Sequence, residues 1–120
     1  MVVVATVLGV SAIAGVSPGS AASAPVYAAG YGTFQQSPST LALWASDALV
    51  HLGWQHWGSA TTTGHGGVTE HSGGVYRTLP ATVQLSQIQF CGGRRVYTHV
   101  SYEFQGRWQT GHRNGCRLAA

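Results

Sequence analysis

Six histidines and three carboxylates are the side chains of this chain that could perform acid–base chemistry or hold a metal ion. Neutral imidazole is a good ligand for zinc and copper. However, His51 and His56 would lie on opposite faces of a regular strand, and no Cys-x-x-Cys or His-x-Glu-x-x-His motif accompanies them. We therefore expect surface histidines, no metal and no other cofactor. Convergence of His65 and His71 within a glycine-rich stretch is the alternative.

The small number of acidic residues also limits the possible kinds of catalysis. Only three acids are present to orient a histidine for nucleophilic attack, and the Gly-x-Ser-x-Gly motif is missing. The enzyme alternative that the residue types allow is a small secreted ribonuclease-like hydrolase that uses acid–base catalysis. Its base would be Glu70, its acid His112 or His71, and its phosphate contact Arg94 or Arg95. No motif supports this alternative, so we assign no catalytic residue.

Binding is predicted over catalysis because the chain is rich in tryptophan. Trp usually buries most of its surface and finds a partner for its N–H, so core packing is one interpretation, above all for Trp54 and Trp57. The other is that Trp44, Trp57 and Tyr97 line an exposed face of a sheet and bind sugar rings or a partner protein. Cell-envelope glycan and protein are therefore the expected partners.

The charge pattern argues against a specific nucleic-acid surface. The chain has six Lys plus Arg residues against three acids, which gives a formal net charge of +3. All six are Arg, they are dispersed, and only Arg94 and Arg95 are adjacent. Nucleic-acid surfaces need a denser basic patch than this.

The elements that would position these residues are β-strands. Residues 95–104 alternate most clearly, which predicts a strand with one buried and one wet face. The buried face would carry Val96, Thr98, Val100, Tyr102 and Phe104, and the wet face Arg95, Tyr97, His99, Ser101 and Glu103. On the wet face, Tyr97 between Arg95 and His99 is the best candidate for a ligand contact.

Shorter alternating runs and glycine turns predict further strands. Leu41–Ala45 and Ala48–Trp54 indicate a hairpin, with a helix over 40–52 as the rival. A strand with a bend or bulge is expected from Trp54 to Thr69, turns at 72–74 and 91–93, and an irregularity near Ser86-Gln87 where the apolar face switches to Ile88 and Phe90. The predicted fold is all-β, a small antiparallel sandwich or partly open barrel over residues 40–105.

The flanking segments look less regular. Residues 23–39 are rich in Gly, Ser, Gln and Pro and are expected to form a flexible arm. Residues 106–120 are expected to form a tail that Cys116, and to a lesser degree Trp108, would anchor. In an exported protein an isolated cysteine pair indicates a disulfide, so we expect Cys91 to pair with Cys116.

The N-terminus has the features of a secretory signal peptide over residues 1–22. The apolar run Val2–Val16 ends at Ser17-Pro18 and is followed by small residues. It is diluted and too short for a membrane span, which needs about twenty apolar residues, so no span is expected after processing. Cleavage is expected after Ala22, or alternatively after Ala28. No Lys or Arg follows Met1, which indicates an upstream start or an atypical leader.

Several short motifs occur in order between about Leu49 and Phe104. They are Trp54-x-x-Trp57-Gly58-Ser59, Thr63-x-Gly, Leu79-Pro80-Ala81-Thr82-Val83-Gln84-Leu85-Ser86, Cys91-Gly92-Gly93 and Val96-Tyr97-Thr98. In these motifs the chain resembles a family of small exported actinobacterial proteins with no assigned activity. The resemblance implies secretion and a β-rich domain and transfers no catalytic residue. Relatives often carry an additional Cys pair at the position of residues 70–74. The resemblance therefore leaves open which cysteine pairs with Cys91.

Together these observations predict a secreted, extracellular β-domain that acts as a non-catalytic binding or cell-envelope-associated module.

Overall fold

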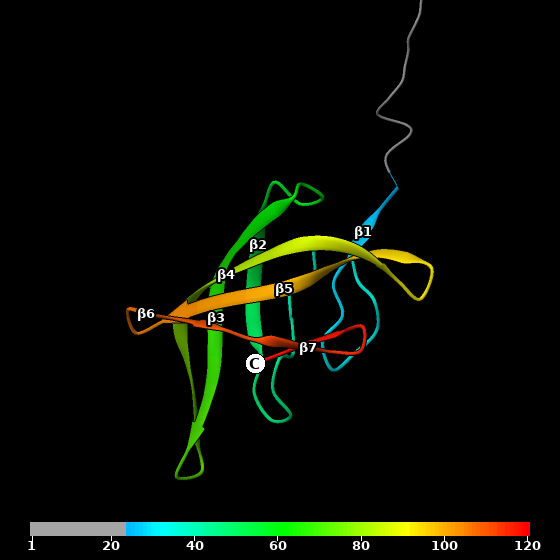
Figure 1. The fold of residues 1–120 in the computed structure, drawn as a ribbon. Helices are drawn as coiled ribbons and strands as arrows, with labels where there is room; N and C mark the ends of the chain where they lie inside the picture. Colours follow the sequence, from blue (N-terminus) through cyan, green and yellow to red (C-terminus); the bar gives the residue numbers. More distant parts are fainter. Residues whose placement is uncertain (1–23) are drawn as a thin grey trace, which may run out of the picture.

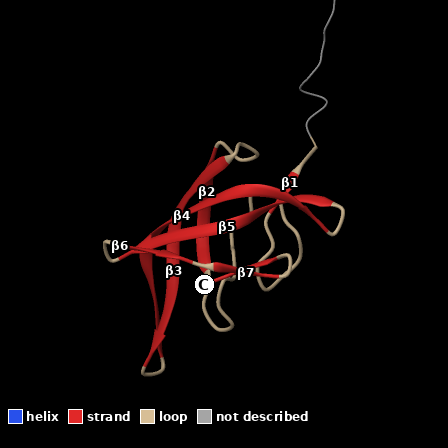
Figure 2. Ribbon diagram, viewed as in Figure 1, coloured by secondary structure: helices blue, strands red, loops and turns tan. Residues whose placement is uncertain are grey.

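The computed structural model describes residues 24–120, so the expected signal peptide and its cleavage site after Ala22 lie outside the described residues. Within this range every regular element is a β-strand (Figure 2). The strands are β1 (Val26–Tyr27), β2 (Leu49–Gln55), β3 (Thr61–Ser72), β4 (Val75–Cys91), β5 (Arg94–Phe104), β6 (Arg107–Thr110), β7 (His112–Asn114) and β8 (Arg117–Ala119). No segment of residues 24–120 forms a helix able to cross a membrane. The predicted all-β class is confirmed.

Six strands form one sheet in the order β1-β5-β4-β3-β2. β6 pairs with the end of β5, on the edge whose beginning is paired with β1. All neighbours in this sheet are antiparallel except β1 and β5, which are parallel and so add one pairing that the antiparallel prediction did not include. The long strands bend strongly and curl the sheet into a partly open barrel (Figure 1).

Residues 28–48 connect β1 to β2 and contribute Leu41 and Leu43 to the core. Leu41 and Leu49 form an isolated antiparallel bridge, which ties this segment to the start of β2. The Leu118 amide in β8 donates to the carbonyl of Ala29 at 2.7 Å, which ties the same segment to the C-terminal hairpin. The irregular segment therefore supplies backbone partners that a further strand would otherwise supply.

The core lies inside the curl and is formed by the alternating residues of β3, β4 and β5. Val83 and Leu85 of β4 are fully buried, as is Val100 of β5. Gln87 has a left-handed φ of 58°, which lets the apolar face of β4 continue from Leu85 to the partly buried Ile88. The irregularity expected near Ser86-Gln87 is thus confirmed.

Two details of the predicted strands are wrong. Phe90, expected to follow Ile88 into the core, is 78% exposed near the end of β4. Residues 40–48 form neither the first strand of a hairpin nor a helix, although Leu41 and Leu43 are buried as their alternation indicated. Backbone bonds to β2 and the C-terminus hold this segment, and those partners leave no local sequence signal.

The segment expected as a flexible arm is packed against the sheet. Its residues Val26, Ala28 and Ala29 are buried, and β1 pairs with β5. Ala28 and Gln35 exchange two backbone hydrogen bonds of 2.8 and 2.9 Å, which close residues 28–35 into a compact loop. Small residues are typical of linkers, but here they permit close packing.

The C-terminal residues are also more ordered than a tail. The disulfide Cys91–Cys116 is present, as predicted, with a Cα–Cα distance of 5.8 Å, and joins the end of β4 to the turn between β7 and β8. The main apolar anchor is Leu118, which is fully buried, whereas Trp108 is 54% exposed and does not anchor the segment.

Candidate functional site

The aromatic face predicted from the sequence is not exposed. Tyr97 is only 1% exposed. Its hydroxyl accepts a hydrogen bond from the Gly58 N–H at 2.8 Å and donates one to the Ser59 carbonyl at 2.7 Å. Burial raises the pKa of Tyr97, although the Gly58 bond and the charge of Arg95 act in the opposite direction. Tyr97 is thus a core residue and cannot contact a ligand.

The two neighbouring tryptophans are also used in packing. The rings of Trp54 and Trp57 meet edge to face at 4.9 Å, and Trp57 meets Tyr97 in the same way at 5.2 Å. The Trp57 Nε1–H donates to the Val26 carbonyl at 2.9 Å, and the Trp54 Nε1–H donates to a carbonyl in the segment before β2. The core-packing interpretation of both residues is therefore confirmed.

The residues of the ribonuclease alternative are not brought together. The carboxylate of Glu70 pairs with Arg77 near the tip of the β3–β4 hairpin. His71 is the next residue of the same strand, so it points to the opposite face, where its ring stacks on Tyr76 at 4.3 Å.

The two candidate phosphate contacts lie at the other end of the sheet. Arg94 is paired with the last residue of β4 and stacks on the ring of Phe34 at 4.7 Å. Arg95 donates to the Ala24 carbonyl at 2.9 Å. His112, the other candidate acid, belongs to the separate β7–β8 pair. The geometry therefore assembles no acid, base and phosphate contact from these residues.

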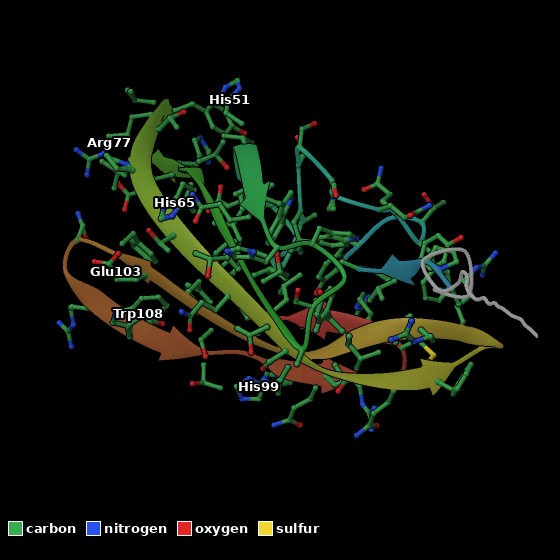
Figure 3. All side chains as sticks on the ribbon, turned by 90° about the horizontal axis from the view of Figure 1, so that it is seen from above. His51, His65, Arg77, His99, Glu103 and Trp108 are labelled. Carbon is green, nitrogen blue, oxygen red and sulfur yellow. A yellow bond between two sulfur atoms is a disulfide. The ribbon has the colours of Figure 1, made fainter. Side chains whose placement is uncertain are left out.

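A different set of residues forms a continuous row across four strands. His65 of β3 is paired with Thr82 of β4, Thr82 with Glu103 of β5, and Glu103 with Trp108 of β6. Residues directly opposite one another in antiparallel strands point to the same face. His65, Glu103 and Trp108 indeed follow one another across the sheet (Figure 3). We call the face that carries this row the outer face.

A second polar row lies beside the first on the outer face. Its members are Thr63, Gln84, Ser101 and Thr110, which the register places opposite one another. None of the eight side chains in the two rows is apolar except that of Trp108. The opposite face of the same strands carries the buried Val83 and Leu85. The outer face is therefore a polar surface with one exposed aromatic ring at its edge.

The outer face is hollowed beside this row. A depression of about 490 Å³ is lined in part by His65, Thr82 and Glu103, together with the turn between β5 and β6. The His65 Nδ1 and Thr82 Oγ1 atoms lie 3.4 Å apart. No ion pair to Glu103 is found among residues 24–120, so its carboxylate is free to accept from a ligand.

The sequence predicted parts of this face but not its centre. His99, Ser101 and Glu103 were placed on the wet face of β5, and they are partly exposed there. Trp108 was missed because its segment was interpreted as a tail. The available signal was the short glycine turn at Gly106, which allows a hairpin and sets Trp108 opposite Glu103.

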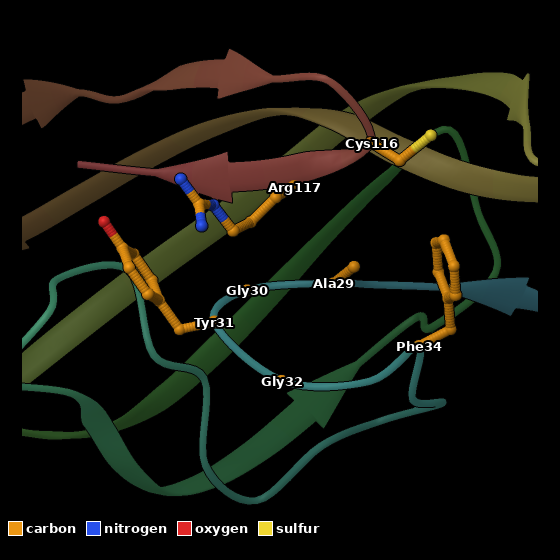
Figure 4. A pocket seen from close by; sticks show the side chains of 7 residues that line it. All are labelled: Ala29, Gly30, Tyr31, Gly32, Phe34, Cys116 and Arg117. Carbon is orange, nitrogen blue, oxygen red and sulfur yellow. The ribbon is translucent and has the colours of Figure 1, made fainter.

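A further hollow, of about 410 Å³, lies between residues 29–34 and Arg117 (Figure 4). The Arg117 guanidinium lies 4.1 Å from the centre of the Tyr31 ring. Together with Arg94 on Phe34, this contact fixes the residue 28–35 loop against the end of the sheet by cation–π attraction. These arginines are thus accounted for by packing.

Trp44, the last predicted ligand residue, lines a small pocket on the side of the sheet opposite the outer face. The pocket has a volume of about 110 Å³ and is also lined by Asp47, Glu70 and Phe104. Trp44 meets the buried Tyr102 edge to face at 5.3 Å. Trp44, Trp57 and Tyr97 therefore do not form one common face.

Comparison with protein-family models, with curated proteins and with solved structures finds no match to this chain.

Proposed function

We propose that this chain is an exported, non-catalytic binding module whose outer face holds a glycan of the cell envelope. The observation that carries the proposal is the row His65–Thr82–Glu103–Trp108, which ends in an exposed indole ring beside a depression in the sheet.

The chemistry of this row complements a sugar. A pyranose ring has C–H groups on its flat faces and hydroxyl groups around its rim. The exposed face of Trp108 offers a rigid apolar surface for the C–H groups. Glu103 and Gln84 supply hydrogen-bond acceptors, and His65 supplies either a donor or an acceptor according to its tautomer. Because neighbouring strands lie about 4.8 Å apart, a row over four strands extends over about 14 Å, which suits a chain of sugars.

The composition of the face supports binding over hydrolysis. Cleavage of a glycosidic bond uses two carboxyl groups about 5 to 10 Å apart. Glu103 is the only carboxylate on the outer face, because Asp47 and Glu70, the other two acids of the chain, line the pocket on the opposite side. A single carboxylate can bind a hydroxyl group, but it cannot act both as the general acid and as the base or nucleophile of the cleavage.

The disulfide supports the exported location. Disulfides persist in oxidising compartments and are rare in reducing ones. The Cys91–Cys116 bond closes a loop of 25 residues, which in the chain-entropy model stabilises the fold by about 3 kcal/mol. This agrees with the N-terminal leader expected from the sequence.

The test is retention of the refolded, oxidised protein on insoluble cell-wall glycan, with release of soluble sugar and cleavage of RNA measured in the same samples. We expect the protein to be retained on the glycan, and we expect neither release of soluble sugar nor cleavage of RNA. Replacing Trp108→Ala removes the apolar platform and should weaken retention by about tenfold, which corresponds to 1.4 kcal/mol.

The matched control is Phe90→Ala, which removes another exposed aromatic ring at the far end of β4 and should leave retention unchanged. Equal loss in both variants would indicate nonspecific adsorption through exposed rings. Retention unaffected by Trp108→Ala, or release of sugar by the wild type, would contradict the proposal.

A further inference from the structure

We infer that the pocket lined by Trp44, Asp47, Glu70 and Phe104 binds a primary ammonium group carried by a small organic molecule, such as an amino sugar. This site is separate from the outer face. It lies between the loop before β2, the end of β3 and the end of β5, on the opposite side of the sheet from Trp108. We call it the ammonium pocket.

The charge of the pocket is the first argument. The whole chain has only three acidic side chains, and two of them line this one small pocket. Glu70 is neutralised by Arg77, whose Nε donates to it at 2.7 Å. Asp47 has no such partner among residues 24–120. One negative charge therefore remains uncompensated, which suits a single monovalent cation.

The state of the Asp47 carboxylate is the second argument. Its Oδ1 atom is buried and has no hydrogen-bond partner among the described residues. A buried acceptor without a donor is unfavourable, and more so when it is charged. An ammonium group held in the pocket beside the partly exposed Asp47 side chain would supply the missing positive charge.

The pocket is also rigid at the place where Asp47 is attached. The adjacent Ala48 N–H donates to the Thr69 Oγ1 at 2.9 Å, and the Thr69 N–H donates to the Ala48 carbonyl at 2.9 Å. These two bonds hold the loop against β3. The carboxylate is thus fixed before a ligand arrives, which lowers the entropy lost on binding.

The aromatic walls select the kind of cation. Trp44 and Phe104 are both packed on Tyr102, Trp44 edge to face at 5.3 Å and Phe104 stacked at 6.3 Å. Aromatic rings attract ammonium groups by cation–π interaction. Hard metal ions such as calcium instead require six to eight oxygen ligands. Residues 24–120 contain no group of three His, Cys, Asp or Glu side chains able to hold a metal, so the pocket favours the organic cation.

The size of the pocket sets an upper limit on what enters it. About 110 Å³ accommodates an ammonium group with a short alkyl stem but not a whole sugar ring. The remainder of an amino sugar would therefore lie outside the pocket, over Glu70 and the exposed end of the β3–β4 hairpin.

The test is calorimetric titration of the full chain with methylammonium chloride, glucosamine, glucose and calcium chloride. We expect methylammonium to bind, glucosamine to bind more tightly than glucose, and calcium not to bind. Asp47→Asn keeps the shape of the side chain but removes its charge, and it should weaken amine binding at least tenfold. Glu103→Gln, which removes the one acidic side chain outside the pocket, is the matched control and should leave methylammonium binding unchanged.

The Asp47→Asn variant also gives a second readout, its stability. Because Asp47→Asn removes a partly buried charge that forms no ion pair among residues 24–120, the variant should unfold at a urea concentration no lower than that of the wild type. Loss of amine binding together with retained stability would therefore report on the site and not on misfolding. Equal amine affinity in the wild type and Asp47→Asn, or binding of calcium in place of the amines, would overturn the inference.

The two proposals fail independently. Trp108→Ala should leave methylammonium binding unchanged, and Asp47→Asn should leave retention on a neutral glycan unchanged. If the protein binds amines but no glycan, the result supports the ammonium pocket and excludes the proposed function.

Discussion

Tyr97 is buried and holds two parts of the fold together, although its position in the sequence predicts an exposed side chain. Its hydroxyl connects β5 to the tight loop that follows β2, through Gly58 and Ser59. Strict alternation along β5 placed Tyr97 on the wet face, but Tyr97 is paired with Ile88, beyond the irregularity at Gln87 where the apolar face switches. It therefore belongs to the core, against Trp57. Alternation predicts a face only as far as the next irregularity of the sheet.

This residue predicts a measurable effect on stability and its pH dependence. Tyr97→Phe keeps the ring and removes two buried hydrogen bonds, which should lower the free energy of unfolding by about 1–3 kcal/mol at pH 7. Denaturant unfolding measures the difference. Tyr76→Phe, at an exposed tyrosine, should have no effect and serves as control.

The sign of the pH effect follows from the raised pKa of Tyr97. Its ordinary value is 10.0, and the folded protein keeps the proton to a higher pH than the unfolded chain does. The contribution of the neutral phenol is fully present below pH 10 and is lost as pH rises through the folded pKa. The difference in the free energy of unfolding between the wild type and Tyr97→Phe should therefore become smaller above pH 10. A constant difference would contradict the assignment.

Among the elements, the pairing of β2 with β3 depends on glycine. The register shifts between Val50 and Gly53, so β2 contains a bulge opposite Gly66, and His51 adopts a left-handed φ of 55° there. A Cβ atom on Gly66 would collide with the backbone oxygens of Val50 and His51. The sequence predicted a bend or bulge from Trp54 onward, and the structure places it in β2, before that point.

We expect Gly66→Ala to destabilise the protein by about 1–3 kcal/mol, because the bulged backbone must move away from the new methyl group. The matched control is Gly53→Ala in the partner strand, where an added Cβ meets nothing within 4 Å. That variant should change stability by less than about 0.5 kcal/mol. Equal unfolding midpoints for the two variants would exclude the steric explanation.

At the scale of the whole molecule, closure of the curl depends on the N-terminal segment. β1 completes the edge of β5, and the Val26 carbonyl accepts the Trp57 indole N–H. Cleavage after Ala28 would remove β1 and this acceptor, whereas cleavage after Ala22 would keep both. Of the two expected cleavage sites, the fold therefore favours Ala22 over Ala28.

A chain that begins at Ala29 should consequently be less stable than one that begins at Pro25, by about 3 kcal/mol or more, because it loses the burial of Val26 and several hydrogen bonds. Thermal or urea unfolding of the two purified chains tests this. The N-terminus of the natural protein, determined by mass spectrometry, should lie before Val26. Equal stability of the two chains would show that β1 contributes little to closure.

The sequence alone determined the all-β class, the disulfide, the turns at glycine and the irregularity near Gln87, because each depends on residues that are close in the chain or on one covalent pair. Tertiary structure alone decided which aromatic rings are covered, where residues 24–49 pack, and that Trp108 joins Glu103 and His65 in one row. These features depend on contacts between segments far apart in the chain. Alternation within a strand says which residues share a face, but the curl of the sheet and the loops across it decide which face meets water.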